Sequence, residues 1–302
     1  MEKNKEPLTI SERLRQLESI INVDKFIDRY RIDDDDIKTY YKVTRKLFRR
    51  LQSKEGFMHF HVSKTGTYSP DDEVYQAEVA ARYIVPGSKV LEMGSGQGAN
   101  LLYLASKYPD SEFWGIDLIP AKLDKELPNL TIRQQSYQSM PEFPDNTFDV
   151  VYAVETIVHN EDKESIFREA HRVLNPGGKF IVFDWAQGRP YETYTSDEQK
   201  ALDLIFKGNA TAPIELEDAW TDHFAKAGFT VVSAADRTKE ILPDLKRLEQ
   251  KADSIMTNPL WVKMCFHTMP KLLVSNLFVG YLGYETAKND VWRYKEWIYQ
   301  KL

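Results

Sequence analysis

The sequence contains a single cysteine, Cys265, among its 302 residues. One cysteine can form neither an internal disulfide nor a cluster of thiolate ligands, which fits a reducing, cytoplasmic setting. Long apolar runs are lacking, and the charged N-terminus MEKNKEPLTISERLRQ has no apolar centre, so we expect neither a transmembrane helix nor a signal peptide. A basic excess is also lacking, because the net charge is -6, so we expect no nucleic acid partner.

What is present is the composition of a globular chain, with 42% hydrophobic and 28% charged residues. The length allows one large domain or one domain with an added lobe. The patterns predict a helical region at 1–87 that covers substrate and cofactor, a nucleotide-binding core at 88–236, and a segment at 237–302 of helices plus a final strand.

Between residues 88 and 236, strand-like and helix-like segments alternate. This alternation predicts a doubly wound, Rossmann-like α/β fold with a parallel sheet, helices on both faces and a ligand at the carboxyl ends of the strands. We expect 293–302 to add a last strand at the edge of the sheet, after a helical insertion. The other expected strands are 88–93, 111–119, 129–135, 146–154, 179–185 and 229–236, and the core helices are 98–109, 121–127, 162–174 and 219–228.

One short segment carries the clearest chemical pattern. In VLEMGSGQGANLLYLA, at 90–105, an apolar strand runs into a glycine-rich turn and then into a helix. The glycines allow a tight turn, and the helix N-terminus offers unpaired N–H groups to a nucleotide. Gly94, Gly96 and Ala99 fit the dinucleotide fingerprint, and Asp117, after the next strand, suits the two hydroxyls of an adenosine ribose. Such a site serves NAD and S-adenosylmethionine equally.

Later features favour the second cofactor. Glu92 stands where the NAD fingerprint has an apolar residue, and a negative group there suits the positively charged methionine part of S-adenosylmethionine. GIDL at 115–118, NTFDVVYAVETIVH at 146–159 and IFREAHRVLNPGGKFIVFDW at 166–185 follow in order. Together with the glycine turn, these motifs resemble class I S-adenosylmethionine-dependent methyltransferases. The resemblance implies a transferase of EC class 2.1.1 that uses S-adenosylmethionine.

The same resemblance implies a set of cofactor residues. Ser136 stands where the family commonly has an aspartate that contacts adenine, so Tyr137 or Gln138 could supply that contact instead. The expected cofactor residues are Tyr68, Glu92, Gly94, Ser95, Gly96, Gly98, Asn100, Asp117, Leu118, Ser136, Tyr137, Gln138 and Val154.

A narrower resemblance concerns the methyl acceptor. YAVETIVHN at 152–160, YYKVTRKLFRRLQSKEGFMHF at 40–60 and Trp185 are similar to segments of sterol and prenyl diphosphate C-methyltransferases. Methylation of an alkene carbon creates a carbocation, which aromatic faces shield and a base must deprotonate. Glu155, at a strand end where burial would raise its pKa, is the expected base, and a surface or helix-capping role is the alternative.

Further candidate side chains surround this base. His159 would orient Glu155 or cap the next helix, and Tyr68 would contact the sulfonium or only pack in its loop. His59 and His61 alternate in FMHFHV, but no third ligand is evident, so we expect no metal, with magnesium relevant only to a diphosphate substrate. The expected catalytic residues are Glu155, His159 and Tyr68, and the expected substrate residues are Tyr41, His59 and Trp185.

The sequence therefore predicts a C-methyltransferase that acts on an alkene carbon of an isoprenoid, either a prenyl diphosphate or a sterol-like compound, in terpene biosynthesis. The nearest alternative is an N- or O-methyltransferase of a small metabolite. An NAD(P)-dependent reductase and a silent binding protein are more distant alternatives. The aromatic segment 258–292 is expected to form a substrate lid or the interface of a homo-oligomer.

Overall fold

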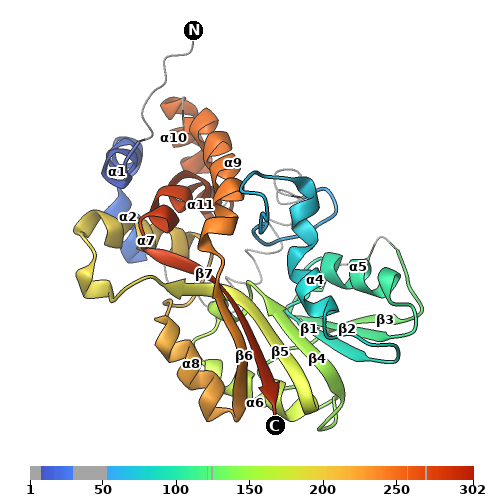
Figure 1. The fold of residues 1–302 in the computed structure, drawn as a ribbon. Helices are drawn as coiled ribbons and strands as arrows, with labels where there is room; N and C mark the ends of the chain where they lie inside the picture. Colours follow the sequence, from blue (N-terminus) through green and yellow to red (C-terminus); the bar gives the residue numbers. More distant parts are fainter. Residues whose placement is uncertain (1–7, 30–52, 121, 124, 257, 269–270) are drawn as a thin grey trace.

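The computed structural model describes residues 8–29, 53–120, 122–123, 125–256, 258–268 and 271–302. In this part of the chain, a seven-stranded sheet with the order β3-β2-β1-β4-β5-β7-β6 carries a lobe of helices over one end (Figure 1). The strands are β1 (Lys89–Met93), β2 (Glu112–Asp117), β3 (Leu130–Gln134), β4 (Phe148–Val154), β5 (Leu174–Gln187), β6 (Phe229–Asp236) and β7 (Trp292–Lys301).

Strands β1 to β5 pair in parallel, whereas β7 runs antiparallel to both β5 and β6. The expected doubly wound α/β fold is confirmed, but the expected position of the last strand is wrong, because β7 lies inside the sheet and β6 forms the edge. Burial explains the order. Tyr294 and Trp297 of β7 are fully buried, whereas Val231 and Val232 of β6 are exposed, as suits an edge strand.

Successive residues of β4 divide between the two faces of the sheet. Val150 and Tyr152 pack on the face covered by α4 and α5, whereas Val151 and Ala153 pack on the face covered by α6 and α8. The order of strands reverses between β1 and β4, and such a switch point is where doubly wound sheets bind ligands. The covering helices are α4 (Tyr75–Ala81), α5 (Ala99–Lys107), α6 (Lys163–Val173) and α8 (Glu217–Lys226).

One predicted core helix is absent. The described residues of 121–127, which are 122–123 and 125–127, are not helical, so the prediction of a helix there is wrong. Pro120 and Pro128 bracket this short segment, and the residue before a proline is disfavoured in helical conformation. Seven residues between two prolines leave too little chain to form a stable helix.

The helical lobe stands over the carboxyl ends of the parallel strands (Figure 1). Its N-terminal part is fixed by Arg13, which is 2% exposed and pairs with the buried Glu249 at 2.7 Å and with Asp253 at 2.7 Å. Loss of one partner of a buried ion pair is strongly destabilising, so α1 is firmly anchored to α9. The helices of the lobe are α1 (Ile10–Glu18), α2 (Val23–Arg29), α7 (Ser196–Gly208), α9 (Thr238–Met256), α10 (Pro259–Thr268) and α11 (Lys271–Lys288).

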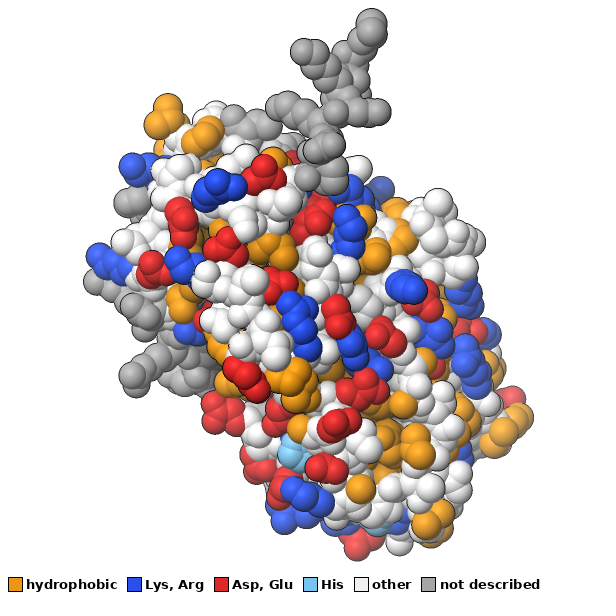
Figure 2. All heavy atoms as spheres, turned by 60° about the vertical axis from the view of Figure 1, so that its left-hand side comes forward, with side chains coloured by type: hydrophobic (Ala, Val, Ile, Leu, Met, Phe, Trp, Pro, Cys, Tyr) orange, Lys and Arg blue, Asp and Glu red, His pale blue; other side chains and the backbone are white. Residues whose placement is uncertain are grey.

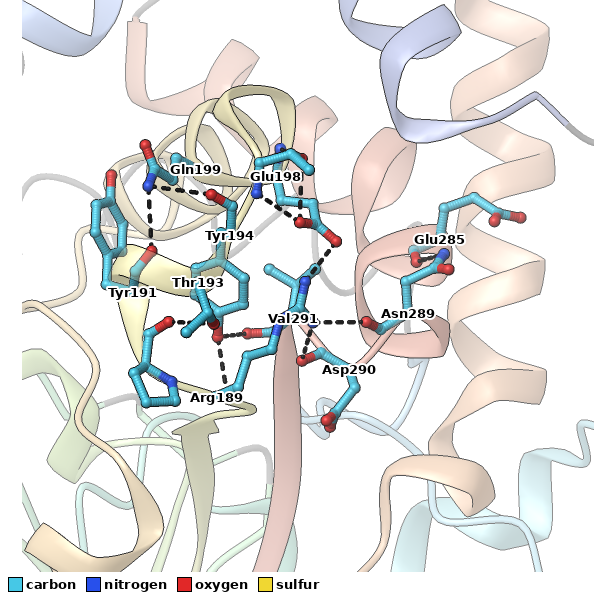
Figure 3. A network of polar contacts seen from close by, with 12 residues as sticks. Arg189, Tyr191, Thr193, Tyr194, Glu198, Gln199, Glu285, Asn289, Asp290 and Val291 are labelled. Carbon is cyan, nitrogen blue, oxygen red and sulfur yellow. Dashed lines mark hydrogen bonds and ion pairs between the residues drawn. The ribbon is translucent and has the colours of Figure 1, made fainter.

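A polar network ties the lobe to the start of β7 (Figure 3). The Arg189 guanidinium donates to the carbonyls of Asn289 and Asp290 at 3.1 Å and to Glu198 of α7 at 2.7 Å. The Tyr194 hydroxyl donates to the Val291 carbonyl at 2.8 Å. These contacts fix the first residues of β7 relative to β5 and α7.

On the face drawn in Figure 2, acidic and basic side chains are interspersed over the surface. No helix in the described part of the chain is long and apolar enough to cross a membrane.

Candidate active site

The turn between β1 and α5 brings the backbone close to the residues that follow β4. Gly94 has a φ of +72°, a conformation that favours glycine, and a Cβ at this position would lie 2.2 Å from Thr156 Oγ1. The backbone N–H groups of Gly94 and Ser95 donate to the Ile116 carbonyl at 2.8 and 3.0 Å. Both the conformation and the close approach therefore require glycine at position 94.

The Asp117 carboxylate ends β2 and faces this turn. Its Oδ2 accepts a hydrogen bond from the Gly96 N–H at 2.9 Å, and its Oδ1 accepts one from the Ile119 N–H at 2.7 Å. Each carboxylate oxygen keeps acceptor capacity after one such bond. Two acceptors held by backbone N–H groups match the paired hydroxyls of a ribose.

A pocket of about 530 Å³, counted with the solvent at its mouth, opens between the glycine turn, the end of β4 and residues 56–59. No Lys or Arg occurs among its described lining residues. Of the residues predicted from the sequence, it brings together Glu92, Gly94, Ser95, Gly96, Asn100, Asp117, Val154, Glu155 and His59. Ala99, which belongs to the glycine fingerprint, also lines it, and the lining residues that the sequence did not reveal are Gly56, Phe57, Met58, Gln97 and Thr156.

Glu92 lies in the floor of the pocket and is 2% exposed. Its Oε1 accepts a hydrogen bond from Asn100 Nδ2 at 2.9 Å, and His59 Nε2 lies 3.4 Å from Asn100 Oδ1. Burial raises the pKa of Glu92 to about 8 and lowers that of His59 to about 4. This wall therefore presents the Glu92 carboxyl, with no Lys or Arg beside it in the described lining, and the neutral imidazole of His59.

The wall also has polar atoms without partners. Ser95 Oγ and Gln97 Nε2 are buried and make no hydrogen bond within the described residues. S-adenosylmethionine carries a sulfonium, an amino acid group and ribose hydroxyls, which pair with carboxyls, hydroxyls and amides of this kind. The residues present therefore fit S-adenosylmethionine, with Glu92 and Asp117 as its acidic partners.

Glu155 lies across the pocket from the glycine turn, immediately after β4. Its φ of +49° is unusual for a residue with a side chain, and such strain is found where a site requires a particular orientation. The Phe60 N–H donates to its Oε1 at 2.7 Å, and the Tyr294 hydroxyl lies close enough to the same carboxylate to lower its pKa. Burial raises the pKa of Glu155 to about 8, although the side chain keeps some exposure toward the pocket.

Beside Glu155, Phe60 is the centre of an aromatic cluster. Its ring is stacked with Trp185 at 5.8 Å and with Trp292 at 5.9 Å, and the Tyr294 ring meets it edge-on at 6.1 Å. Trp185, which was predicted to contact substrate, lies in this cluster and not in the lining of the pocket itself. Its role toward a substrate stays a prediction.

Two predicted catalytic residues lie outside the pocket lining. The Tyr68 ring stacks on His61 at 5.5 Å, and the Arg247 guanidinium lies 4.4 Å from its centre. His159 Nδ1 lies 2.8 Å from the Ala210 carbonyl oxygen. The proposed contacts of Tyr68 with the sulfonium and of His159 with Glu155 stay predictions.

The expected adenine contacts are also not among the lining residues. The Tyr137 hydroxyl donates to the Thr156 carbonyl at 2.8 Å, and Ser136 Oγ accepts from the Gln138 N–H at 3.2 Å. Tyr41 lies outside the described residues. The other predicted residues that do not line the pocket are Gly98 and Leu118. Within the described chain, no three His, Cys, Asp or Glu side chains group as metal ligands.

Two comparisons of sequence agree with this geometry. A family model described as a methyltransferase domain matches residues 91–182. A phosphoethanolamine N-methyltransferase of Triticum aestivum is 33% identical over 171 residues, which cover 54% of this chain and 32% of the relative. A cycloartenol-C-24-methyltransferase of Arabidopsis thaliana is 30% identical over 166 residues, covering 52% of this chain and 49% of the relative. The chain thus spans about a third of the plant N-methyltransferases that it matches.

Solved structures show the same fold. The [4+2]-cyclase SpnF has a TM-score of 0.68 at 17% identity, with 90% of this chain and 99% of that one covered. A geranyl diphosphate methyltransferase has a TM-score of 0.64 at 16% identity, with 89% and 98% covered. The glycine turn, the acidic pocket, the strand order and the matching domain lead to one conclusion: residues 91–182 belong to an S-adenosylmethionine-dependent methyltransferase domain with the class I fold.

Proposed function

We propose that this methyltransferase adds a methyl group to an alkene carbon of an isoprenoid, with Glu155 as the general base. The observation that carries the proposal is the Glu155 carboxyl. It lines the same pocket as the glycine turn, has no Lys or Arg beside it in the described lining, and has a pKa raised to about 8 by burial. A carboxyl with high proton affinity suits the deprotonation of a carbocation.

The chemistry assigns a separate task to each wall. S-adenosylmethionine supplies an electrophilic methyl group on a sulfonium. When the alkene attacks that methyl carbon, a C–C bond would form while the S–CH3 bond breaks, its electron pair going to sulfur so that S-adenosylhomocysteine leaves. The adjacent carbon of the acceptor would then be cationic. Glu155 in its ionised form accepts a proton from a neighbouring carbon, and the electrons of that C–H bond become the new double bond. The protonated carboxyl then returns the proton to solvent.

The aromatic cluster supports the same assignment. Phe60 donates its N–H to Glu155 and places its ring against Trp185 and Trp292. Aromatic faces stabilise a nearby cation by about 0.5–2 kcal/mol without offering a nucleophile that would trap it. Attack by an amine leaves no carbocation and needs no such surroundings.

Names of relatives add support for the substrate class. The Arabidopsis relative is a cycloartenol-C-24-methyltransferase, and a Schizosaccharomyces pombe relative, 28% identical over 176 residues, is a sterol 24-C-methyltransferase. Both names describe methylation at carbon of an isoprenoid skeleton, which is the class that we propose here.

The second candidate is methylation of a small amine, favoured by the 33% identity to the wheat phosphoethanolamine N-methyltransferase. A phosphate-bearing amine is expected to need cationic partners. The described lining of the pocket supplies Glu92, Asp117 and Glu155 and no Lys or Arg. This charge balance favours an acceptor without a phosphate in the pocket itself.

The test is turnover of labelled S-adenosylmethionine with a panel of sterols, prenyl diphosphates and small amines. We expect an isoprenoid product, and we expect Glu155→Gln to lower turnover by about 10²–10⁴-fold, the usual contribution of a general base, with cofactor binding unchanged. Glu161→Gln is the matched control, because Glu161 is exposed and lies six residues further along the chain. A methylated amine as the product, with Glu155→Gln fully active, would refute the proposal.

A further inference from the structure

The Glu155 carboxylate belongs to a ring of hydrogen-bonding groups whose other members, Phe60, Gln76 and Tyr294, lie outside both the glycine turn and the matched domain. The ring passes from Glu155 through Phe60 to Gln76 of α4 and Tyr294 of β7. We propose that Tyr294 and Gln76 are positioning residues for Glu155, with the Tyr294 hydroxyl directed at the carboxylate and the Gln76 amide setting its direction. This inference rests on the proposed role of Glu155 as the base.

The distances define the ring. The Phe60 N–H donates to Glu155 Oε1 at 2.7 Å, while the carbonyl of the same residue accepts from Gln76 Nε2 at 2.8 Å. Gln76 Nε2 also lies 3.0 Å from the Tyr294 hydroxyl oxygen. The Tyr294 hydroxyl lies close enough to Glu155 to lower the pKa of that carboxyl, and the carboxylate raises the pKa of the hydroxyl. Such contacts are often long before a ligand binds and tighten in the complex.

Hydrogen-bond polarity fixes the direction of each contact. A carbonyl only accepts, so the amide atom of Gln76 that faces the Phe60 carbonyl must be the nitrogen. That nitrogen has a second hydrogen, which it donates to the Tyr294 oxygen. Because the oxygen of Tyr294 is then an acceptor toward Gln76, its own hydrogen is left to point at Glu155.

Burial shows that this arrangement is costly. Gln76 and Tyr294 are both completely buried, and Gln76 Oε1 has no hydrogen-bond partner among the described residues. An unpaired buried amide oxygen is unfavourable, and a glutamine that served only to fill space would be replaced at no loss by an apolar residue. The amide is accounted for by its two donated hydrogen bonds.

The polar network in Figure 3 fixes the residues just before β7, the strand that carries Tyr294. Tyr194 and Gly188 both donate to the Val291 carbonyl, at 2.8 and 3.2 Å, three residues before Tyr294. Arg189 fixes the preceding turn through the carbonyls of Asn289 and Asp290. The base and the residue that orients it therefore lie at the same edge of the sheet, on β4 and β7, the two strands that flank β5.

The test measures Glu155 itself in the full-length protein. Carbon-13 NMR of protein labelled at the glutamate carboxyl carbons gives its titration, and the signal that Glu155→Gln removes identifies it. In Tyr294→Phe we expect an upward shift of about 1 in the pKa of Glu155, because one hydrogen bond to the ionised form is lost. The acid limb of the kcat profile should move upward by the same amount, with the KM for the acceptor unchanged.

Two further variants keep the test decisive. Gln76→Met should shift the pKa of Glu155 in the same direction by a smaller amount, and it replaces Tyr294→Phe if that variant does not fold. Tyr75→Phe is the matched control, because its buried hydroxyl donates to Glu296 at 2.9 Å and not to Glu155. Tyr75→Phe should lower the unfolding temperature and leave the titration of Glu155 unchanged.

The outcomes separate this inference from the proposed function. A Glu155 titration that is equal in the wild type, Tyr294→Phe and Gln76→Met would overturn the positioning role, whatever the activity. Full turnover by Glu155→Gln would instead refute the base itself, while the titration would still report whether Tyr294 acts on Glu155. A shift in Tyr75→Phe equal to that in Tyr294→Phe would also overturn the inference, since it would show a general loss of packing.

Discussion

The two walls of the pocket are built in different ways. The cofactor wall comes almost entirely from one stretch of sequence, 92–100, together with Asp117 at the end of the neighbouring strand. In the wall that we assign to the acceptor, Glu155 lines the pocket and is held by Phe60 and Tyr294, which are buried behind it. Phe60 and Glu155 are 95 residues apart, and Tyr294 lies beyond the helical insertion. Cofactor binding is thus a local property of the sequence, whereas the setting of the base is a property of the whole fold.

Glu92 and Glu155 make the difference concrete. Burial raises the pKa of each carboxyl to about 8, and both line the pocket. Glu92 accepts from a side-chain amide eight residues along the chain, in α5, whereas Glu155 accepts from a backbone N–H of a distant segment. Two carboxyls with similar acidity therefore differ in what holds them, and perturbations far from the pocket should affect only the second.

Apart from the loss of turnover in Glu155→Gln, the largest effect is expected in the cofactor wall, at Gly94. A Cβ there meets Thr156 Oγ1 at 2.2 Å, and forcing such a contact costs about 1–3 kcal/mol. Gly94→Ala should therefore weaken S-adenosylmethionine binding by roughly 10- to 100-fold, measured by calorimetry.

Gly87→Ala is the matched control for that change. Gly87 has a φ of +86° and an added Cβ would meet nothing within 4 Å, so this variant has the backbone strain without the clash. Equal losses of cofactor affinity in both variants would mean that strain alone is responsible and that the glycine turn does not approach Thr156 closely.

A smaller effect is expected in the acceptor wall, at Trp185. Trp185→Phe replaces the indole beside Phe60 with a smaller ring and so removes aromatic contact area from the cluster. It should raise the KM for the acceptor by about 3- to 10-fold, in line with an aromatic contact of about 0.5–1.5 kcal/mol. Affinity for the cofactor should not change.

Trp220→Phe provides the comparison. Trp220 is fully buried on the other face of the sheet, stacked on Trp297 at 4.8 Å. The Trp220→Phe variant should have a lower free energy of unfolding and an unchanged KM for the acceptor. If both variants lower stability and neither changes the KM for the acceptor, Trp185 is only a core residue.

The smallest expected effect is on the pH dependence of the free energy of unfolding, to which buried carboxyls of both walls contribute. Burial raises the pKa of Glu92 and Glu155 to about 8 and that of Asp184 to about 7. The folded chain therefore keeps protons that the unfolded chain releases above about pH 4. The contribution of these protonated carboxyls to the free energy of unfolding is full below that pH and is lost as the pH rises through 7 to 8. Urea unfolding at several pH values should show this fall, and Glu155→Gln should make it shallower. An equal slope in the variant would contradict the raised pKa of Glu155.

The cofactor wall was largely predictable from the sequence. Gly94, Gly96 and Asp117 sit at the junctions of regular elements, where the alternation of strands and helices already places the carboxyl ends together. Thr156 was missed because nothing in its own pattern marks it; only the Cβ position of Gly94 shows that the two residues meet.

The acceptor wall was only partly predictable. Glu155 stood out because it follows a strand, but its partners Gln76 and Tyr294 carry no motif, and their roles depend on α4 and β7 meeting Phe60. The position of β7 was predicted wrongly for the same reason. A local pattern identifies a strand, whereas its neighbours in the sheet are decided by burial on both of its faces.

The central claim is that the methyl group is transferred to carbon and that Glu155 removes the proton. The most direct measurement is carbon-13 NMR of the product made from S-adenosylmethionine labelled in its methyl group, with wild type and Glu155→Gln side by side. We expect a methyl resonance bonded to carbon in the wild-type product, with essentially no product from Glu155→Gln. A methyl resonance bonded to nitrogen or oxygen, formed equally by both proteins, would contradict it.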